Sequence, residues 1–426
     1  MYDAYLIPND ETCPFCGSSS YSKNGHTKTI INHTPYKTSL VKVTLYLQNY
    51  KCNDCGKTFR ETNTFSNPKE TISIESLKTI LTDLLNPCAT FSAVARDNHV
   101  KKCEVIELFD RYIDFPVIHN LPEIISFDEK HINKKLTCNA YAFVMLDFKT
   151  KKVIDLVVSR HKAKLRDYFK NYPKFVRDNV KFVTIDMWPT YRDITLEFFK
   201  NAKIVIDSFH VMKEINNALD KVRLSVMQKY NDKTDTLEAN HPYYFVLKKY
   251  RTWLTTEKDN LTDKSFYIKK LNGWYNRDSL IKYMTNIDSK LEKGYELVSD
   301  YREFNKTCSY KDCEKEFDEL VERFYEIGIS SFTDVANMLT TWKEYILNSF
   351  IPVLDCVDEN GEIRRLSNGP IEGTNLILEK INLNGNGYQN FWRFRNRVIF
   401  SFNKDVSQIN HLVRKNFNIP KKKKKK

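Results

Sequence analysis

Long apolar runs are missing from this sequence. No uninterrupted apolar stretch among its 426 residues approaches the roughly 20 residues that a membrane-spanning helix needs. The first residues, MYDAYLIPND, also lack the basic and then apolar pattern of a secretory signal. We therefore expect a cytoplasmic protein that has neither a membrane anchor nor a membrane partner.

Acidic residues are in the minority. The chain has 54 aspartates and glutamates against 67 lysines and arginines, which gives a formal net charge of +13. The six terminal lysines 421–426 account for six units of this net charge, so the rest of the chain has a net charge of +7. A positive body with a positive tail favours a polyanionic partner, nucleic acid above all. The alternative is a basic globular protein without such a partner. The length indicates about two to four domains.

The cysteines favour metal binding over disulfides. Ten cysteines in a long, lysine-rich chain suit a reducing compartment. Four of them form two Cys-x-x-Cys turns, and an alternating strand-like run over residues 40–47 leads to the second turn. This pattern predicts a structural Zn²⁺ site in a zinc ribbon over residues 1–66, with the ligands Cys13, Cys16, Cys52 and Cys55. The alternatives are a redox pair, or a site in which His26 or His33 replaces one cysteine.

Residues 67–120 are predicted to be helical. Apolar residues recur at helical spacing from Ile74 to Leu85, and Pro87 ends the run. A short capped helix over residues 90–97, a turn, and a helix over residues 101–112 then follow in the order of a helix-turn-helix. The basic residues that would reach a DNA groove or phosphates are Arg96, Lys101 and Lys102. An ordinary packing unit of three helices is the alternative.

Residues 121–207 change to a mixed pattern of strands and helices. Three strand-like runs joined by tight turns come first, and two more follow, each after a helix. This order predicts a mixed α/β sheet, and it resembles the ribonuclease-H-like fold. Asp128 and Asp186 lie near the ends of two of these strands. Spacing alone does not single them out, because similar positions are held by Asp147, Asp155 and Asp207.

Residues 208–366 are highly charged and helical in pattern, with a long amphipathic run over residues 212–228. We expect an all-helical insertion here, after which residues 367–415 return to the α/β domain. Their first helix has a cap and a proline at its start, carries Glu372 in its first turn, and stops at Gly385 and Gly387. A first-turn glutamate also has a purely structural explanation, because it complements the helix dipole.

Aromatic residues alternate with arginines after this helix. The arginines of the run YQNFWRFRNR are Arg393, Arg395 and Arg397. They would contact DNA by charge and stacking, or they would form the basic face of an ordinary packed helix, and the pattern favours neither. Residues 416–426 are a basic tail that would act as an electrostatic tether.

Clustered carboxylates make physical sense when they hold a cation. Without one they repel each other, and burial raises their pKa values. Mg²⁺ and Mn²⁺ prefer oxygen ligands, and two such ions about 4 Å apart support in-line phosphoryl transfer. We therefore predict that the catalytic metal ligands are Asp128, Asp186 and Glu372.

The motifs along the chain resemble those of ISL3-family insertion-sequence transposases. They are CPFCG and CNDCG, the helix-turn-helix pattern, SFDEKH, TIDMWPTYRD, IVIDSFHVMKEINNALDKVR, SNGPIEGTNLILEKI and GYQNFWRFRNR. The resemblance implies a bacterial DDE recombinase that acts on the nucleoid, with Asp128, Asp186 and Glu372 at the catalytic positions. It also implies that His210, in an element with Asp207, assists the site. The expected partners are terminal inverted repeats, target DNA and further copies of the chain, as a homodimer or larger oligomer.

The sequence thus predicts a multidomain α+β transposase that reads double-stranded DNA with its N-terminal domains. Its carboxylates would cut and join DNA with catalytic Mg²⁺ or Mn²⁺, and Zn²⁺ would be structural. Two other functions fit the same residues: a transposase-derived DNA-binding regulator without catalysis, and a metal-dependent DNA nuclease. The presence of all three carboxylates favours an enzyme over the regulator, and strand joining would separate a transposase from a nuclease.

Overall fold

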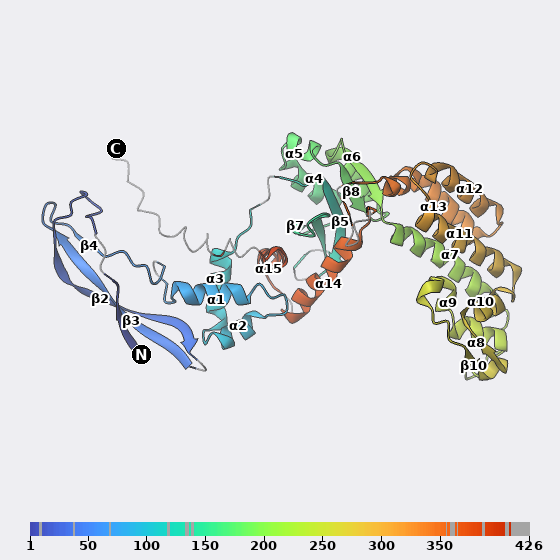
Figure 1. The fold of residues 1–426 in the computed structure, drawn as a ribbon, viewed down its shortest axis with the longest axis horizontal. Helices are drawn as coiled ribbons and strands as arrows, with labels where there is room; N and C mark the ends of the chain where they lie inside the picture. The colour runs from blue at the N-terminus through green and yellow to red at the C-terminus, as the bar shows by residue number, and fades with distance from the viewer. Residues whose placement is uncertain are drawn as a thin grey trace.

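The molecule is elongated, and its parts follow one another in chain order until the C-terminal helices return to the centre (Figure 1). The structure is a computed structural model. It describes residues 1–7, 11–36, 39–67, 70–116, 120–132, 136–137, 140–354, 356–357, 363, 365–385, 388–404 and 409. The basic tail at 416–426 and the predicted stop at Gly387 lie outside the described residues. No helix in the described part of the chain is both long and apolar enough to cross a membrane.

The N-terminal part is a β-sheet built on a long hairpin. Its strands are β1 (Tyr2–Tyr5), β2 (Tyr21–Tyr36), β3 (Ser39–Cys52) and β4 (Thr58–Arg60). β2 and β4 pair antiparallel with β3, and β1 pairs parallel with it. The alternate residues Val43, Leu45 and Leu47 are buried, as expected for a strand with one covered face. The predicted strand over residues 40–47 is therefore confirmed, and it extends to the second cysteine turn.

Helices form the next part of the chain, close to the predicted boundaries. They are α1 (Ile74–Asp83), α2 (Phe91–Asp97) and α3 (Lys102–Tyr112). The first two begin at hydroxyl caps, because Ser73 Oγ accepts a hydrogen bond from the N–H of Ser76 and Thr90 Oγ1 accepts one from the N–H of Ala93. These caps explain why the sequence located both helix starts closely.

A five-stranded mixed sheet lies at the centre of the molecule. Its strands are β5 (Ile124–His131), β6 (Tyr141–Asp147), β7 (Val153–Val157), β8 (Phe182–Ile185) and β9 (Lys203–Ile206). Their order is β7-β6-β5-β8-β9, with antiparallel pairs among β5, β6 and β7 and parallel pairs among β5, β8 and β9. The predicted mixed α/β sheet is confirmed. The crossovers to β8 and β9 contain α4 (Lys162–Lys170), α5 (Lys174–Asp178) and α6 (Pro189–Phe198).

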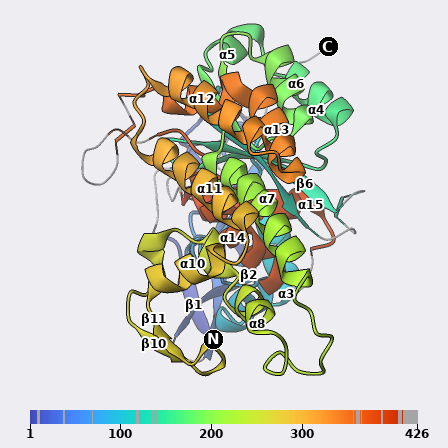
Figure 2. The same ribbon diagram turned by 90° about the vertical axis from the view of Figure 1, so that its right-hand side faces the viewer.

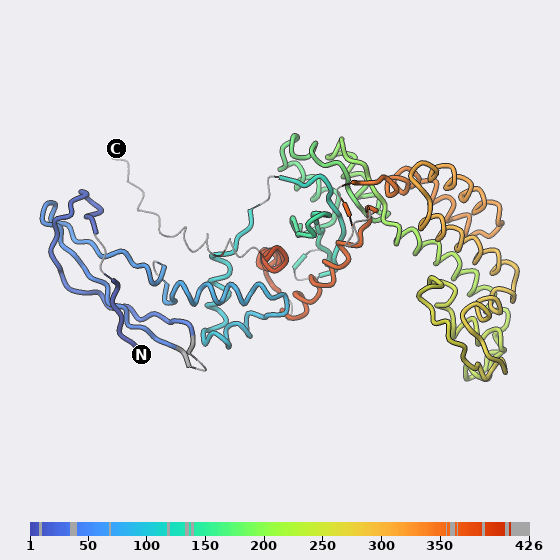
Figure 3. Tube along the Cα trace, in the orientation of Figure 1, coloured from blue at the N-terminus to red at the C-terminus, as the bar shows by residue number. Residues whose placement is uncertain are grey.

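Both faces of the central sheet are covered. On one face, Phe127 and Phe143 pack against Phe169 of α4 and Tyr191 of α6. On the other face, residues of β6 and β7 share a core with α1, α2 and α3 and with the C-terminal helices α14 (Gly369–Asn384) and α15 (Phe391–Asn403). Figure 3 shows this C-terminal segment between the N-terminal helices and the sheet. The second core therefore joins the two ends of the chain.

The segment between β9 and α14 is mostly helical. It contains α7 (Ser208–Gln228), α8 (Pro242–Lys249), α9 (Thr252–Thr255), α10 (Arg277–Thr285), α11 (Ser289–Thr307), α12 (Cys313–Glu326) and α13 (Ser330–Leu347). The long helices α7, α11 and α13 pack together (Figure 2). α7 begins directly after β9, one turn before the predicted run over residues 212–228.

The expectation that this insertion is all-helical is wrong in one element. β10 (Phe266–Ile268) and β11 (Gly273–Tyr275) form a short antiparallel hairpin within it. Asn272 lies in the turn with φ +50°, a left-handed conformation that asparagine tolerates. Tyr267 packs against Trp274 across the strands, and such aromatic pairs stabilise hairpins. Each strand is too short for its alternation to stand out in a charged, helical segment.

A buried ion pair fixes α15 on the sheet. Arg395 is 3% exposed and pairs with Asp155 of β7, which is also buried. The other oxygen of Asp155 accepts a hydrogen bond from Tyr168 Oη at 2.7 Å. The guanidinium group also donates to the backbone oxygen of Phe115 at 2.9 Å. Arg395 is thus enclosed by the protein, and the structure corrects the prediction that it contacts DNA.

Arg397 connects α15 to the N-terminal helices. Its side chain is 1% exposed and donates to the backbone oxygens of Leu84, Asn86 and Ala89, the last two at 2.8 and 3.0 Å. These carbonyl groups lie at and beyond the end of α1, where helical partners run out. The prediction that Arg397 contacts DNA is corrected for the same reason: its donors face the protein interior, not solvent.

We expect Arg395→Met to destabilise the fold by about 3–5 kcal/mol, because it leaves the Asp155 carboxylate buried without its partner. The matched control is Arg166→Met. This change removes an ion pair to Glu197 in which the side chains are 45% and 37% exposed, and it should cost about 1 kcal/mol or less. Thermal unfolding followed by circular dichroism compares the two. Equal melting temperatures would contradict a structural role for the buried pair.

Candidate active site and metal centres

Three aspartates lie level with one another at one edge of the central sheet. Asp128 lies in β5, Asp186 directly follows β8, and Asp207 directly follows β9. The parallel registers of β5 with β8, and of β8 with β9, continue to make these residues neighbours. Carboxyl ends of parallel strands meet at the same edge, which is why residues far apart in sequence come together here.

Asn368 brings the C-terminal helix to this edge. It is the residue that precedes α14, and it is 1% exposed. Its Nδ2 donates to Asp186 Oδ1 at 3.0 Å and to the backbone oxygen of Phe127 at 3.2 Å, while its Oδ1 accepts from Thr184 Oγ1 at 2.6 Å. Its backbone N–H donates to Asp207 Oδ1 at 3.2 Å. The side chain of Asn368 thus joins α14 to β5, β8 and Asp186, and its backbone joins α14 to the residue after β9.

Glu372, in the first turn of α14, meets Asp207 and His210. One ligand atom from each of these three residues lies within 4.8 Å of the others. His210 also bridges two aspartates, since its Nδ1 lies 3.2 Å from Asp207 Oδ2 and its Nε2 lies 3.1 Å from Asp186 Oδ2. Among the residues that the structure describes, this is the compact acidic group that could hold a metal ion.

Of the predicted carboxylates, Glu372 lies in the compact group with Asp207 and His210, and Asp186 lies 3.1 Å from His210. Asp128 is the neighbour of Asp186 in the continued register of β5 and β8. Asp128 accepts a hydrogen bond from Nδ2 of an α14 residue one turn after Glu372, Asn375. Strand spacing presented Asp207 as one of several similar aspartates, and the family resemblance placed it in an element with His210. Its spacing from His210 was the available signal, because residues three apart at a helix start lie on the same side.

Burial and mutual repulsion raise the pKa values of these carboxyl groups. Desolvation, reinforced by the charge of Asp186, raises the pKa of Asp128 to about 7. Desolvation also raises the pKa of Asp186 against the opposing influence of His210, and desolvation with the charge of Asp207 raises that of Glu372. The hydrogen bond to Asp207 raises the pKa of His210. Burial, with the charge of neighbouring carboxylates as a smaller cause, thus disfavours ionisation of these carboxyl groups in the folded protein.

The donor set fits a divalent cation such as Mg²⁺ or Mn²⁺. Carboxylate oxygens are the hard ligands that these ions prefer, and a cation would relieve the repulsion that raises the pKa values. Beside Asp128, Asn375 Oδ1 is buried and has no hydrogen-bond partner among the described residues. A buried acceptor of this kind is normally satisfied by ordered water or by a bound group.

A family model described as Transposase, that of the ISL3 transposases, matches residues 125–398. This is more than half of the chain. The chain belongs to the ISL3 transposase family. The predicted resemblance is confirmed, and the matched region contains every residue of the acidic site.

A curated relative gives a second finding for this transposase. The transposase for insertion sequence element IS1001 from Bordetella parapertussis is 27% identical over 140 residues, which cover 33% of this chain. The aligned part spans 32% of that relative's length, about a third of it.

The chain brings the four cysteines of its two Cys-x-x-Cys turns together in the N-terminal part. Their Sγ atoms lie within 4.8 Å of one another, with 3.6 Å between Cys13 and Cys55 and between Cys16 and Cys52. The glycine that follows each Cys-x-x-Cys turn has a positive φ, +80° at Gly17 and +69° at Gly56, a conformation that other residues rarely adopt. Four thiol ligands in a closed set fit structural Zn²⁺, as the sequence predicted, and leave no open position for chemistry.

The two histidines considered as replacement ligands are engaged elsewhere. His33 Nδ1 lies 2.8 Å from Ser73 Oγ, the hydroxyl that caps α1, and the His26 ring packs edge-on against Tyr5. Neither belongs to the metal-ligating group found in the described part of the ribbon. The cysteines alone therefore form the zinc-type site.

The basic residues predicted to reach DNA have different surroundings. Lys101 and Lys102 are exposed at the start of α3, and Arg96 is exposed near the end of α2, where it pairs with Asp97 at 2.9 Å. The predicted contact Arg393 instead makes paired hydrogen bonds to the carboxylate of Asp110 in α3. With Arg395 and Arg397 buried, the exposed residues of α2 and α3 are the surviving candidates from the sequence.

We expect the purified protein to contain about one Zn²⁺ per chain and Cys16→Ser to lose most of it, because a tetrahedral site needs all four ligands. The ribbon should then unfold while the central sheet keeps its melting transition. Zinc content by mass spectrometry and thermal unfolding measure the two effects. Cys88→Ser is the control, since Cys88 is exposed and lies outside the cluster. Equal zinc in both variants would contradict the assignment.

Without a divalent cation, we expect stability to fall as the pH rises towards 8. The pKa of Asp128 is raised from its ordinary 3.8 to about 7, so the folded state keeps this proton where the unfolded chain has lost it. The resulting stabilisation is complete below about pH 4 and disappears as the pH rises through about 7. Melting temperatures from pH 5 to 8 in EDTA test this.

Asp128→Asn should flatten that pH dependence, because its amide does not titrate. Added Mg²⁺ should raise the melting temperature of the wild type most at pH 8. If the variant and the wild type lose stability in parallel, the carboxyl group of Asp128 is not the source of the effect.

Proposed function

We propose that this transposase binds the terminal inverted repeats of its element and catalyses metal-dependent DNA cleavage and strand transfer. The observation that carries the proposal is the compact group of Glu372, Asp207 and His210, with Asp186 against His210 at 3.1 Å, at one edge of the sheet inside the family-matched region. Carboxylates at this density repel one another unless they hold cations, and cations held this way support phosphoryl transfer.

The arrangement of elements supports a ribonuclease-H-like catalytic core. In the sheet order β7-β6-β5-β8-β9 the first three strands form a meander and the last two are parallel, and α14 carries a carboxylate to the edge. We assign residues 121–207 and 367–415 to this core and residues 208–366 to an insertion. Residues 1–66 form a zinc ribbon in this assignment, and residues 67–120 form a helix-turn-helix domain.

The polar residues around the carboxylates hold them in place. Asn368 binds Asp186 and Asp207 at once, and a doubly protonated His210 donates to the same two carboxylates. Divalent cations held by Asp128, Asp186 and Glu372 would activate the attacking oxygen and stabilise the leaving oxygen of an in-line displacement. Hydrolysis at each end frees a 3′-hydroxyl, which then attacks target DNA.

We assign sequence reading to the N-terminal domains. Lys101, Lys102 and Arg96 are exposed on α2 and α3 and would contact DNA phosphates or a groove. The net charge of +13 supports an electrostatic component, so affinity should fall steeply with salt. Inverted repeats are related by a two-fold axis, and a homodimer or larger oligomer would match that symmetry.

We expect Glu372→Gln to lower the cleavage rate at the element's own ends at least about a hundredfold, because metal-held charge stabilisation contributes several kcal/mol. Binding to the ends should remain. The control is Glu379→Gln, two turns later on α14, which removes only a surface ion pair to Lys130 at 2.9 Å. Cleavage and joining are followed on labelled DNA with Mg²⁺ and with EDTA.

The outcomes separate the proposed function from its alternatives. Metal-dependent cutting and joining that vanish in Glu372→Gln but persist in Glu379→Gln support the transposase. Cutting without joining would indicate a nuclease. Specific end binding without any cutting would indicate a DNA-binding regulator, and Glu372 would then be a helix-dipole residue.

A further inference from the structure

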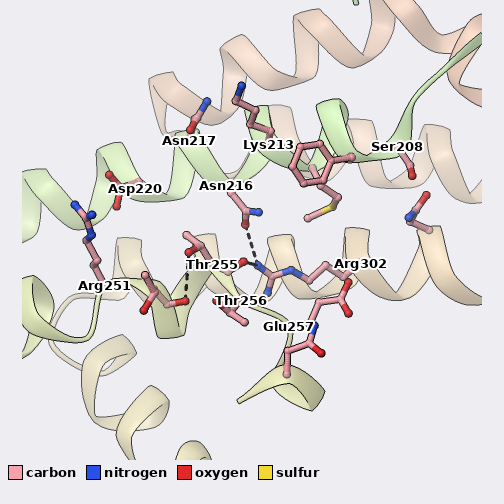
Figure 4. A pocket seen from close by; sticks show the side chains of 15 residues that line it. Ser208, Lys213, Asn216, Asn217, Asp220, Arg251, Thr255, Thr256, Glu257 and Arg302 are labelled. Atoms are coloured by element: carbon pink, nitrogen blue, oxygen red, sulfur yellow. Dashed lines mark hydrogen bonds between the residues drawn. The ribbon is translucent and has the colours of Figure 1, made fainter. Parts of the chain in front are cut away.

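A pocket with many polar side chains in its lining lies among the helices after β9 (Figure 4). It has a volume of about 660 Å³ and is lined by residues of α7, α9 and α11 and of the chain just after α9. Its lining starts with Ser208 and Phe209, which lie in the chain between Asp207 and His210. The pocket and the acidic site therefore share the first turn of α7, and the Phe209 ring in the pocket lies 5.7 Å from the His210 ring of the acidic site, measured between ring centroids.

The lining of the pocket is suited to a nucleotide. Phe209 is 60% exposed and offers an aromatic face, on which any base can stack. Asn216, Thr255 and other amide and hydroxyl groups line the cavity, and these groups donate to and accept from base edges. Lys213 and Arg251 are exposed on its walls and are placed to meet a phosphate.

The walls of the pocket are held together before any ligand binds. Arg302 of α11 donates to Asn216 Oδ1 on α7 at 2.8 Å and to the backbone oxygen of Thr255 on α9 at 2.8 Å. One guanidinium group thus connects the three helices that line the cavity. A site that is already formed loses less entropy when it takes up a ligand.

The two acidic side chains in the lining, Asp220 and Glu257, are compatible with a nucleotide in the pocket. Asp220 is paired with Arg223 at 2.7 Å, so its charge is balanced within α7. Glu257 is exposed, and its single negative charge is outnumbered by the three positive charges of Lys213, Arg251 and Arg302, which line the same cavity. The pocket thus carries a surplus of positive charge next to the acidic site, an arrangement that suits a sugar-phosphate chain leading to bound metal.

We propose that this pocket binds one unpaired nucleotide of the DNA strand next to the scissile phosphate, with its base stacked on Phe209. The inference rests on the proposed function, since it names how the same site takes its DNA. A cavity of this size is far too small for a duplex, so the nucleotide must leave the helix, as bases do in other DNA-processing sites. An insertion far from the N-terminal domains thereby contributes to substrate recognition.

The test compares two DNAs that carry the element's own end, one blunt at the cleavage position and one with a single unpaired thymidine there. Binding to the full-length protein is measured by fluorescence anisotropy with Ca²⁺ in place of Mg²⁺. We expect the wild type to bind the unpaired form about tenfold more tightly, the size expected for one base stacked on one aromatic ring. Phe209→Ala should abolish this preference, and Phe209→Trp should keep it.

The matched control is Phe175→Ala, which removes another exposed aromatic ring, 73% exposed on α5 and outside the pocket. This variant should keep the preference. A second measurement replaces the unpaired thymidine with 5-iododeoxyuridine, and ultraviolet crosslinking should then label the peptide that contains Phe209.

Each other result overturns the assignment. If the wild type binds both DNAs equally, or if Phe209→Ala keeps the preference, the pocket does not hold this nucleotide, while the proposed function stands as long as the blunt end is bound specifically and cut with Mg²⁺. A crosslink to another part of the chain also overturns the pocket assignment. If neither DNA is bound better than a random duplex, the proposed function and this inference both fail.

Discussion

The hydrogen bonds of Asn368 are the interaction on which the candidate active site depends. The buried side-chain amide of Asn368 joins the start of α14 to Phe127 in β5, Thr184 in β8 and Asp186, and its backbone N–H donates to Asp207. Further along α14, Asn375 adds a hydrogen bond to Asp128, so Asn368 fixes the start of the helix that carries Glu372 and Asn375 fixes its next turn. Because both the donor and the acceptor of the Asn368 amide are used, the position of α14 along the strands is specified, and a slip of one residue would leave buried polar groups unpaired.

A second constraint connects the two ends of the chain. The core on one face of the sheet is shared by α1, α2, α3, α14 and α15, and Arg397 and Arg395 add buried polar contacts from α15 to the end of α1 and to Asp155. The helices that would read DNA are therefore packed on the same body as the carboxylates. A DNA end held by α2 and α3 would meet a fixed catalytic edge instead of one that moves independently.

The insertion has a related role in the geometry of the site. A single residue, Asp207, separates the end of β9 from the start of α7, and His210 lies one turn later. The same first turn opens into the pocket among the helices after β9, and Arg302 holds the opposite walls of that pocket in place. Residues 207–210 thus contribute side chains to both the acidic site and the neighbouring cavity.

Local patterns in the sequence were sufficient for the helical spacing of α1, the capped helix α2, the strands of the mixed sheet, the paired cysteine turns and the first-turn position of Glu372. These features depend on residues near one another in the chain, so their physical chemistry can be read from spacing. The roles of Asp207, Arg395 and Arg397 were not readable in this way. An aspartate after a strand, or an arginine beside aromatics, has the same local pattern whether it faces solvent, metal or core. Only the tertiary structure decided that Asp207 joins the acidic group and that the two arginines are buried, because burial depends on partners more than 150 residues away, as with Asn368 and Asp207 or Arg395 and Asp155.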